Sequence, residues 1–268
     1  MPKYTALIRT YNSLPLLNEV LIALKKQTSP PDDYVIVDSS KDPAQKNAIK
    51  QLGLRVIDYP DDEFNFSKAI NIGVEQVKTE LVLIISSHVL LNDITLIERG
   101  LKLDDFSSET YLGFCLTPTI IATDTWMPTK VTKSNFSLDL AASNSCTMLK
   151  TQHIMQRPFL EEVFSAEDQE WAAFYLREKN AYFYRVKAYE ARYLNNNVNE
   201  QKFINEQVAL AYYTHRHMLG YKNIVFRLCR GLLAKMRGRT NRATLHFTIA
   251  KELFQARSKK PIKKSKYF

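Results

Sequence analysis

Three short polar segments of the chain contain side chains that could bind a ligand, and each of them follows an apolar run. They cover residues 9–12 (Arg-Thr-Tyr-Asn), 38–40 (Asp-Ser-Ser) and 86–88 (Ser-Ser-His). Hydroxyl, carboxylate and imidazole groups can all hydrogen-bond a ligand, and an imidazole can also bind Mn²⁺. If the preceding runs are strands of one parallel sheet, their carboxyl ends meet at the edge where such sheets bind ligands. We therefore expect the three segments to face one crevice.

A fourth polar feature, the acidic pair Glu167-Asp168, precedes a helical pattern that continues to residue 179. The helix macrodipole favours acidic residues in a first turn, so local helix stability alone can explain the pair. A carboxylate at a helix start is also held in a fixed direction, as a base in catalysis must be. His215 and His217 are two positions apart and would lie on different sides of a helix, so they are not expected to bind a metal together.

The elements that would position these segments alternate between strands and helices. Residues 35–37 and 81–85 are continuous apolar runs, which are typical of strands buried on both faces of a parallel sheet. Helical spacing follows the first strand and recurs between the others. The order predicts an α/β fold with a doubly wound sheet and right-handed crossovers. The remaining predicted elements are helices over 16–24, 44–52 and 67–77, strands over 55–59 and 111–117, and a loop at Asn195–Asn197.

The bulk composition excludes several classes of protein. With 268 residues, of which 45% are hydrophobic, the chain can fill the core of one large domain. The three cysteines include no Cys-x-x-Cys pair, so neither a disulfide framework nor a thiolate zinc site is indicated. No export leader is recognised, and no apolar run approaches the roughly 20 residues of a membrane-spanning helix. We expect a cytoplasmic protein.

Positive charge is concentrated near the end of the chain. From Lys222 onward there are fourteen Lys or Arg residues against a single acid, Glu252, whereas the preceding residues contain 23 basic and 27 acidic groups. A basic segment of this kind points to a polyanionic partner, either anionic lipid or nucleic acid. Nucleic acid is disfavoured, because the body is acidic and no nucleic-acid-binding motif is found.

Apolar residues within this basic segment recur at helical spacing. Two explanations remain open: the helix packs on the domain, or it adheres to an anionic membrane surface as basic amphipathic helices do. The residues that can share one face are Ile224, Val225, Leu228, Leu232 and Leu233. A doubly wound sheet could also serve a dinucleotide-dependent oxidoreductase or a methyltransferase. However, residues 9–12 are not a glycine-rich turn, and the chain has only seven glycines and no G-x-G-x-x-G sequence.

Three longer motifs, in their order along the chain, resemble glycosyltransferase family 2. They are ALIRTYNSLPLLNEVLIALKKQT with YVIVDSS, then EFNFSKAINIGVEQVKTELVLIISSHVLLND, then CTMLKTQHIMQRPFLEEVFSAEDQEWAAFYLREKN. The resemblance covers about residues 4–180 and includes rhamnosyltransferase-like members. It implies a Rossmann-like GT-A fold and an inverting enzyme that moves a sugar from a nucleotide-diphosphate donor to an acceptor hydroxyl. Polysaccharide or glycolipid assembly is the setting that the resemblance suggests.

The resemblance also implies roles for individual residues. Asp168 would be the catalytic base and Glu167 its supporting neighbour, while Lys68 would approach the donor diphosphate. The residues implied in donor binding are Thr10, Tyr11, Asn12, Asp38, Lys68, Ser86, Ser87 and His88. The sugar or acceptor pocket would include Asn144, Ser145 and Trp171, although core packing is the default expectation for the tryptophan.

The sequence departs from the family at one point, because Ser86-Ser87-His88 stands where the family has Asp-x-Asp. That motif normally holds a divalent cation, Mn²⁺ or Mg²⁺, which offsets charge on the leaving diphosphate. Three possibilities remain: a metal held by His88 and donor phosphates, metal-free transfer with His88 as a hydrogen-bond donor, or an inactive site. We favour a functional His88 and leave the need for a metal open.

We expect two domains, a GT-A domain over residues 1–205 and a helical basic extension over 206–268. The expected partners are a nucleotide-diphosphate sugar and a glycan or lipid-linked glycan. The extension would suit peripheral attachment to the inner face of a membrane. The alternative class of function is a non-catalytic sugar-nucleotide-binding or scaffold protein on the same fold, because the metal motif is replaced.

Overall fold

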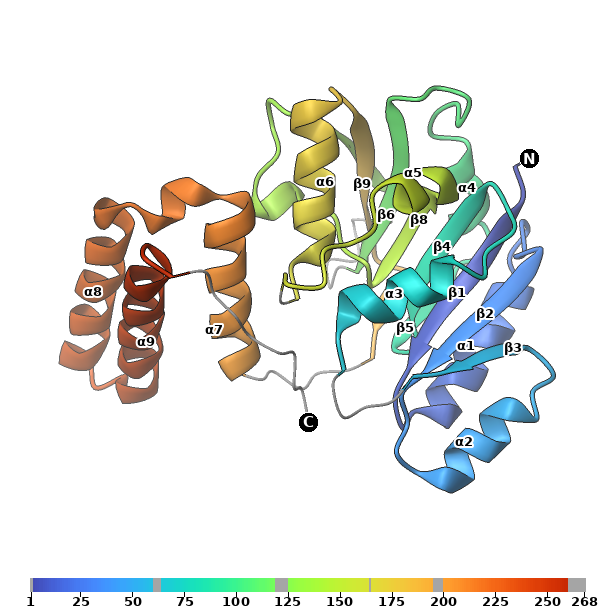
Figure 1. Ribbon diagram of the computed structural model, residues 1–268, viewed down its shortest axis with the longest axis horizontal. Coiled ribbons are helices and arrows are strands. Elements are labelled where there is room, and N and C mark those ends of the chain that lie inside the picture. Colours follow the sequence, from blue (N-terminus) through green and yellow to red (C-terminus); the bar gives the residue numbers. More distant parts are fainter. Residues whose placement is uncertain (1, 60–63, 119–124, 164, 195–199, 260–268) are drawn as a thin grey trace.

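The computed structural model describes residues 2–59, 64–118, 125–163, 165–194 and 200–259, and its centre is an eight-stranded sheet (Figure 1). The strand order is β3-β2-β1-β4-β8-β6-β9-β7. All strands run in one direction except β8, which is antiparallel to β4 and β6, and β7, which is antiparallel to β9. The bounds are β1 Tyr4–Thr10, β2 Asp33–Asp38, β3 Arg55–Asp58, β4 Leu81–Ser86, β6 Tyr111–Pro118, β7 Met127–Val131, β8 Cys146–Lys150 and β9 Tyr182–Ala188.

Helices cover both faces of this sheet, so the predicted doubly wound, mostly parallel α/β fold is confirmed. One face packs against α1 (Leu14–Lys25), α2 (Pro43–Lys50) and α4 (Leu96–Leu101). The other face packs against α3 (Phe66–Val74), α5 (Thr151–Gln156) and α6 (Glu167–Glu178). Outside the main sheet, β5 (Val89–Leu91) pairs with β10 (Ala191–Tyr193), and a short 3₁₀ turn spans Leu138–Leu140. The predicted loop at 195–197 lies outside the described residues.

Helix α3 lies unusually close to the sheet and fixes the segment that leads into α6. A Cβ atom on Gly73 would lie 2.4 Å from Leu7, so only glycine allows this approach without a shift of the leucine. Asn71 uses its whole amide on the backbone of Phe159, donating to the carbonyl oxygen at 2.9 Å and accepting from the N–H at 3.0 Å. Ser67 also donates to the carbonyl of Leu160. The N-x-G pattern of this helix therefore positions the chain just before the acidic pair.

A helical unit follows the sheet domain and has its own small core (Figure 1). It contains α7 (Glu200–Ala209), a π-helical turn (Leu210–Thr214), a 3₁₀ turn (Arg216–Leu219), α8 (Tyr221–Met236) and α9 (Thr240–Ala256). The predicted helical extension is thus present, and the boundary predicted at residue 206 falls inside α7. No helix in the described part of the chain combines the length and apolar character needed to cross a membrane.

Candidate active site

A crevice of about 720 Å³ opens at the carboxyl ends of the parallel strands. This is the edge at which the sequence placed the three polar segments, and most of the predicted site residues line it. They are Thr10, Tyr11, Ser86, Ser87, His88, Asn144, Ser145, Glu167 and Asp168. Four separate stretches of sequence, from β1, β4, the start of β8 and the start of α6, therefore converge on one site.

Asn12 and Asp38 lie beside the crevice and connect its first two loops instead of lining it. Asn12 adopts a positive φ of 44°, and its backbone N–H donates to the Ser40 hydroxyl at 2.8 Å. That hydroxyl in turn donates to Asp38 Oδ1 at 2.6 Å, and the Ser40 backbone N–H donates to the same oxygen. These bonds hold the loop that contains Tyr11, whose side chain does line the crevice. The donor contacts assigned to Asn12 and Asp38 remain predictions.

At the end of β4, the two serines and the histidine have different environments. The Ser87 side chain is fully buried, and its hydroxyl lies 2.8 Å from that of Ser13, which also lies 2.9 Å from the Thr10 hydroxyl. His88 is partly exposed to the crevice, with its ring centroid 6.4 Å from that of Tyr193. Its Nδ1 is buried and has no hydrogen-bond partner among the described residues. Burial lowers the pKa of His88, so the ring is neutral near pH 7.

Asp168 is held rigidly at the start of α6. Its Oδ2 accepts the backbone N–H of Asn144 at 2.8 Å, and its Oδ1 accepts the N–H of Gln169 at 2.7 Å. Burial and the neighbouring charge of Glu167 raise the pKa of Asp168 well above its usual range, against the opposing effect of the two N–H donors. Glu167 is itself 4% exposed. A carboxylate with a raised pKa is a stronger proton acceptor than an exposed aspartate.

Two cations that were assigned no individual role in the sequence analysis also line the crevice. Arg9 donates to the Asn144 carbonyl at 2.9 Å, and its guanidinium carbon lies 5.2 Å from the centroid of the Phe66 ring. Lys202 of α7 places its ammonium 5.7 Å from the same centroid. Lys202 comes from the helical unit, and only its tertiary packing brings it here. Arg9, near the end of β1, opens the segment 9–12 that was expected to face the crevice, although no contact was assigned to it.

A third carboxyl group, Glu206 of α7, also lines the crevice. Burial raises its pKa to about 7, the charge of Glu167 acts in the same direction, and Lys202 opposes them. The folded protein therefore binds a proton here that the unfolded chain releases at lower pH. Linkage then requires this group to lower the stability of the fold as the pH rises from about 4.5 to about 7.

We expect Glu206→Gln to raise the free energy of unfolding at pH 8. The gain at pH 8 should exceed the change at pH 5 by on the order of 1–2 kcal/mol. At pH 5 the folded wild-type side chain is protonated and, like glutamine, uncharged, so only a small part of the pH-dependent penalty is present there. Urea unfolding at both pH values measures the difference. Glu200→Gln, at an exposed position of the same helix, is the matched control and should show no pH-dependent gain. Equal effects of the two substitutions would contradict the assigned burial of Glu206.

Two predicted residues are not part of the crevice lining. The Lys68 side chain is on the exposed side of α3 and is not part of the lining. Trp171 is 2% exposed, packs in the core between Phe159 and Tyr175, and donates its indole N–H to the Arg157 carbonyl at 2.7 Å. Core packing, the default expectation for this tryptophan, agrees with its surroundings.

The residues around the crevice do not match a carboxylate metal centre. No group of three or more His, Cys, Asp or Glu side chains in the described ranges is arranged to hold a metal ion. At the end of β4, the Ser87 hydroxyl is already bonded to Ser13, which leaves the His88 imidazole as the only strong metal ligand among residues 86–88. Mg²⁺ in particular prefers oxygen ligands.

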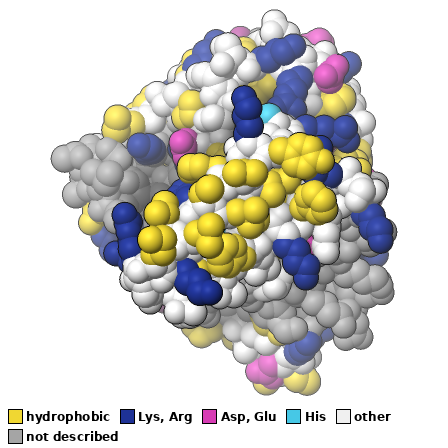
Figure 2. Space-filling view, turned by 90° about the vertical axis from the view of Figure 1, so that its left-hand side faces the viewer, with side chains coloured by type: hydrophobic (Ala, Val, Ile, Leu, Met, Phe, Trp, Pro, Cys, Tyr) yellow, Lys and Arg dark blue, Asp and Glu magenta, His cyan; other side chains and the backbone are white. Residues whose placement is uncertain are grey.

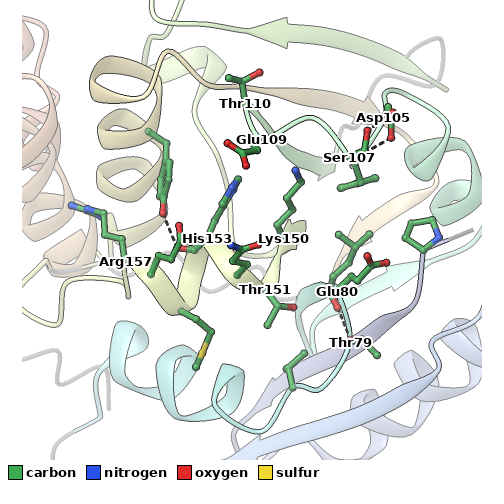
Figure 3. A pocket seen from close by; sticks show the side chains of 18 of the residues that line it. Thr79, Glu80, Asp105, Ser107, Glu109, Thr110, Lys150, Thr151, His153 and Arg157 are labelled. Atoms are coloured by element: carbon green, nitrogen blue, oxygen red, sulfur yellow. Dashed lines mark hydrogen bonds between the residues drawn. The ribbon is translucent and has the colours of Figure 1, made fainter.

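A larger hollow, of about 1460 Å³, lies at the opposite edge of the sheet (Figure 3). Lys150, His153 and Glu109 face it, and Glu80 lies at the amino end of β4. None of the predicted site residues lines this hollow. Because ligands of open α/β sheets bind beyond the carboxyl ends of the strands, the smaller crevice is the better candidate for the active site.

The fold resembles solved glycosyltransferases. A mannosyltransferase from Pyrobaculum calidifontis, solved with GDP-Man and Mn²⁺, matches with a TM-score of 0.62 and 14% identity, over 95% of this chain and 88% of that one. Residues 1–349 of TarS from S. aureus, solved with UDP-GlcNAc, match with a TM-score of 0.52 and 19% identity, over 94% and 88%. Glucosyl-3-phosphoglycerate synthase from Mycobacterium tuberculosis, in complex with phosphoglyceric acid, matches with a TM-score of 0.55 and 12% identity, over 78% and 79%.

The sheet order and these neighbours define the GT-A fold. Residues 5–145 match Glycosyl transferase family 2, and the chain belongs to that family. No curated protein matches the sequence.

Proposed function

We propose that this protein is an inverting glycosyltransferase that uses a nucleotide-diphosphate sugar, with Asp168 as its catalytic base. The observation that carries the proposal is that Asp168 lines the same crevice as Arg9, Lys202 and His88. A proton acceptor and a group of diphosphate-binding side chains are the two parts that such a transfer needs.

In the proposed reaction, the acceptor hydroxyl lies within hydrogen-bond reach of the Asp168 carboxylate. Its oxygen attacks the anomeric carbon from the side opposite the diphosphate and forms the new glycosidic bond, while the bond between that carbon and the diphosphate oxygen breaks. The hydroxyl proton passes to Asp168, and the electron pair of the broken bond leaves with the nucleoside diphosphate. Attack from the opposite side inverts the anomeric configuration. The two backbone N–H groups on Asp168 keep its carboxylate in place during this step.

The charge that develops on the leaving diphosphate would be met by side chains of the protein. Arg9 and Lys202 supply fixed positive charge, and the neutral His88 ring can donate one hydrogen bond. The poor match of residues 86–88 to a metal centre supports transfer that does not depend on a divalent cation. The raised pKa values of Asp168 and Glu206 also limit the negative charge of the crevice that the diphosphate would enter.

The remaining lining residues suggest how the rest of the donor is held. Tyr11, Phe64 and Phe66 present aromatic rings to the crevice, and an aromatic ring can pack on a nucleobase. Asn144 and Ser145, next to the carboxylate, would contact the transferred sugar or the acceptor. A glycan or lipid-linked glycan is the proposed acceptor, and polysaccharide or glycolipid assembly on the inner face of a membrane is the proposed setting.

A thermal-shift screen of nucleotide-diphosphate sugars, in EDTA and in Mn²⁺, tests this function. A bound donor should raise the melting temperature by several degrees at 100-fold excess over its Kd, since that excess contributes about 2.7 kcal/mol of stability. We expect the same donor to bind in EDTA. The donor that binds should then give a product of inverted configuration by NMR. Binding without turnover for every acceptor would favour a non-catalytic sugar-nucleotide-binding protein, and binding only with Mn²⁺ would contradict metal independence.

A further inference from the structure

The side of α8 that faces away from the rest of the protein is apolar and exposed. We call it the outer face of α8, and Figure 2 shows hydrophobic side chains gathered in one patch on this side of the molecule, with Lys and Arg around them. Its central residues recur every three or four positions, and their exposed fractions range from 40% for Leu228 to 83% for Met236. The outer face consists of Tyr221, Val225, Phe226, Leu228, Leu232, Leu233 and Met236.

A different side of α8 holds the helical unit together. Ile224, Gly231 and Ala234 are buried, and a Cβ atom on Gly231 would lie 2.6 Å from the Phe247 ring of α9. The sequence grouped Ile224 with Val225, but adjacent helical residues point about 100° apart, so one is buried and the other is exposed. The packing explanation therefore accounts for the inner side of α8 and leaves the outer face unexplained.

The charge around the outer face is entirely positive along the helix. Helix α8 has three exposed cations, Lys222, Arg230 and Lys235, and no acidic residue, whereas its fourth cation, Arg227, is half-buried and donates to Gln207 of α7. Arg230 lies against Phe226, with 5.6 Å between the guanidinium carbon and the ring centroid, and Arg257 lies 3.9 Å from the centroid of Tyr221. An apolar stripe bordered by cations and aromatic rings is the pattern of helices that lie in the plane of an anionic membrane interface.

We propose that the outer face of α8 docks on an anionic lipid bilayer. The apolar side chains would enter the boundary between headgroups and acyl chains, and the bordering cations would pair with lipid phosphates. A second copy of the chain is a poorer occupant, because two outer faces in contact would bring their positive borders together. The surface charge is thus complementary to anionic lipid and not to itself.

The position of α7 links this surface to the crevice. Ile204 and Val208 of α7 pack into the core of the helical unit, whereas Lys202 and Glu206 of the same helix line the crevice. Helix α7 therefore lies between the crevice and the hairpin of α8 and α9 (Figure 1). Docking through α8 would hold the crevice beside the membrane, roughly 20 Å from it if two packed helices intervene. That this crevice is the active site rests on the proposed function.

Vesicle co-sedimentation of the full chain tests the proposal independently of turnover. We expect binding to vesicles of phosphatidylcholine with phosphatidylglycerol and little binding to phosphatidylcholine alone. Leu232→Ser/Met236→Ser should weaken binding by at least about tenfold, because it removes two inserted side chains without touching the core. Ile22→Ser/Met155→Ser, at positions 53% and 54% exposed on α1 and α5, is the matched control and should bind as wild type. Transfer to a soluble acceptor should be unchanged in both variants.

Two results would overturn the proposal. One is unchanged vesicle binding by Leu232→Ser/Met236→Ser, which would assign any membrane affinity to charge elsewhere. The other is that the wild type does not bind vesicles. If the wild type were then found to be a dimer, and Leu232→Ser/Met236→Ser a monomer, the outer face would be an interface between two copies of the chain. If the wild type bound vesicles but showed no sugar transfer, this result would contradict the proposed function and leave the membrane proposal intact.

Discussion

Asp168→Asn is expected to lower kcat by about 10³-fold, because a positioned general base contributes 10²–10⁴-fold to such a reaction and an amide cannot accept the proton. Donor affinity should stay within a few-fold of the wild-type value, since the substitution keeps the shape of the side chain. The measurement is steady-state transfer together with donor titration by thermal shift. The pH profile provides a second signature. Wild-type activity should rise with pH as Asp168 loses its proton, and this rise should occur at a higher pH than the pKa of an exposed aspartate would give. The variant should not show this rise.

The structure also defines the control that this experiment needs. Both oxygens of Asp168 accept backbone N–H groups, so asparagine must turn its NH₂ toward one of these donors. Some loss of stability is therefore expected, and the melting temperature of the variant must be measured beside its activity. A folded variant that binds donor and still turns over at more than a tenth of the wild-type rate would contradict the role of Asp168.

Arg9→Gln is expected to lower kcat/KM by about 10²-fold, in the presence of EDTA or Mn²⁺ alike. Removing one preorganised donor to a developing negative charge typically costs 10²–10³-fold in rate. Lys202→Gln should have a smaller effect, because a flexible ammonium is a point charge and the planar guanidinium can form two parallel bonds to a phosphate. Steady-state kinetics at several donor concentrations separates the loss of donor binding from the loss of rate.

Lys68→Gln is the matched control for these two variants. The sequence assigned Lys68 to the diphosphate, whereas the structure places it on the exposed side of α3 and places Arg9 and Lys202 in the crevice. Kinetics close to wild type are therefore expected for Lys68→Gln. If Lys68→Gln reduced kcat/KM as much as Arg9→Gln, the diphosphate would bind differently from the arrangement proposed here. Because Arg9 also bonds the Asn144 carbonyl, thermal unfolding should accompany its kinetics.

The parallel half of the fold was predictable because its strands are apolar runs and their order along the chain matches a doubly wound sheet. Residues 9–11 and 86–88 line one crevice at the carboxyl ends of their strands, because parallel strands share the direction of these ends. The reversed strands β7 and β8 were not predicted. Sequence periodicity identifies a strand but does not give the direction in which it joins a sheet.

The roles of individual side chains were harder to predict than their positions along the chain. Asn12 and Asp38 lie at strand ends as expected, but their polar atoms bond Ser40, whose position relative to them could not be predicted from the sequence. Lys202 and Glu206 were missed because α7 reaches the crevice only through tertiary packing of the helical unit. Helical spacing in α8 likewise could not tell the buried side from the exposed one, because both are apolar.

The central claim is that one crevice holds both the diphosphate and the catalytic carboxylate. A crystal structure of Asp168→Asn with an intact nucleotide-diphosphate sugar tests it most directly. We predict that the diphosphate lies within hydrogen-bond distance of Arg9 and that the anomeric carbon faces residue 168, with room between them for an acceptor hydroxyl. A donor bound instead in the hollow beside Lys150 and His153, or with its anomeric carbon turned away from residue 168, would contradict the account.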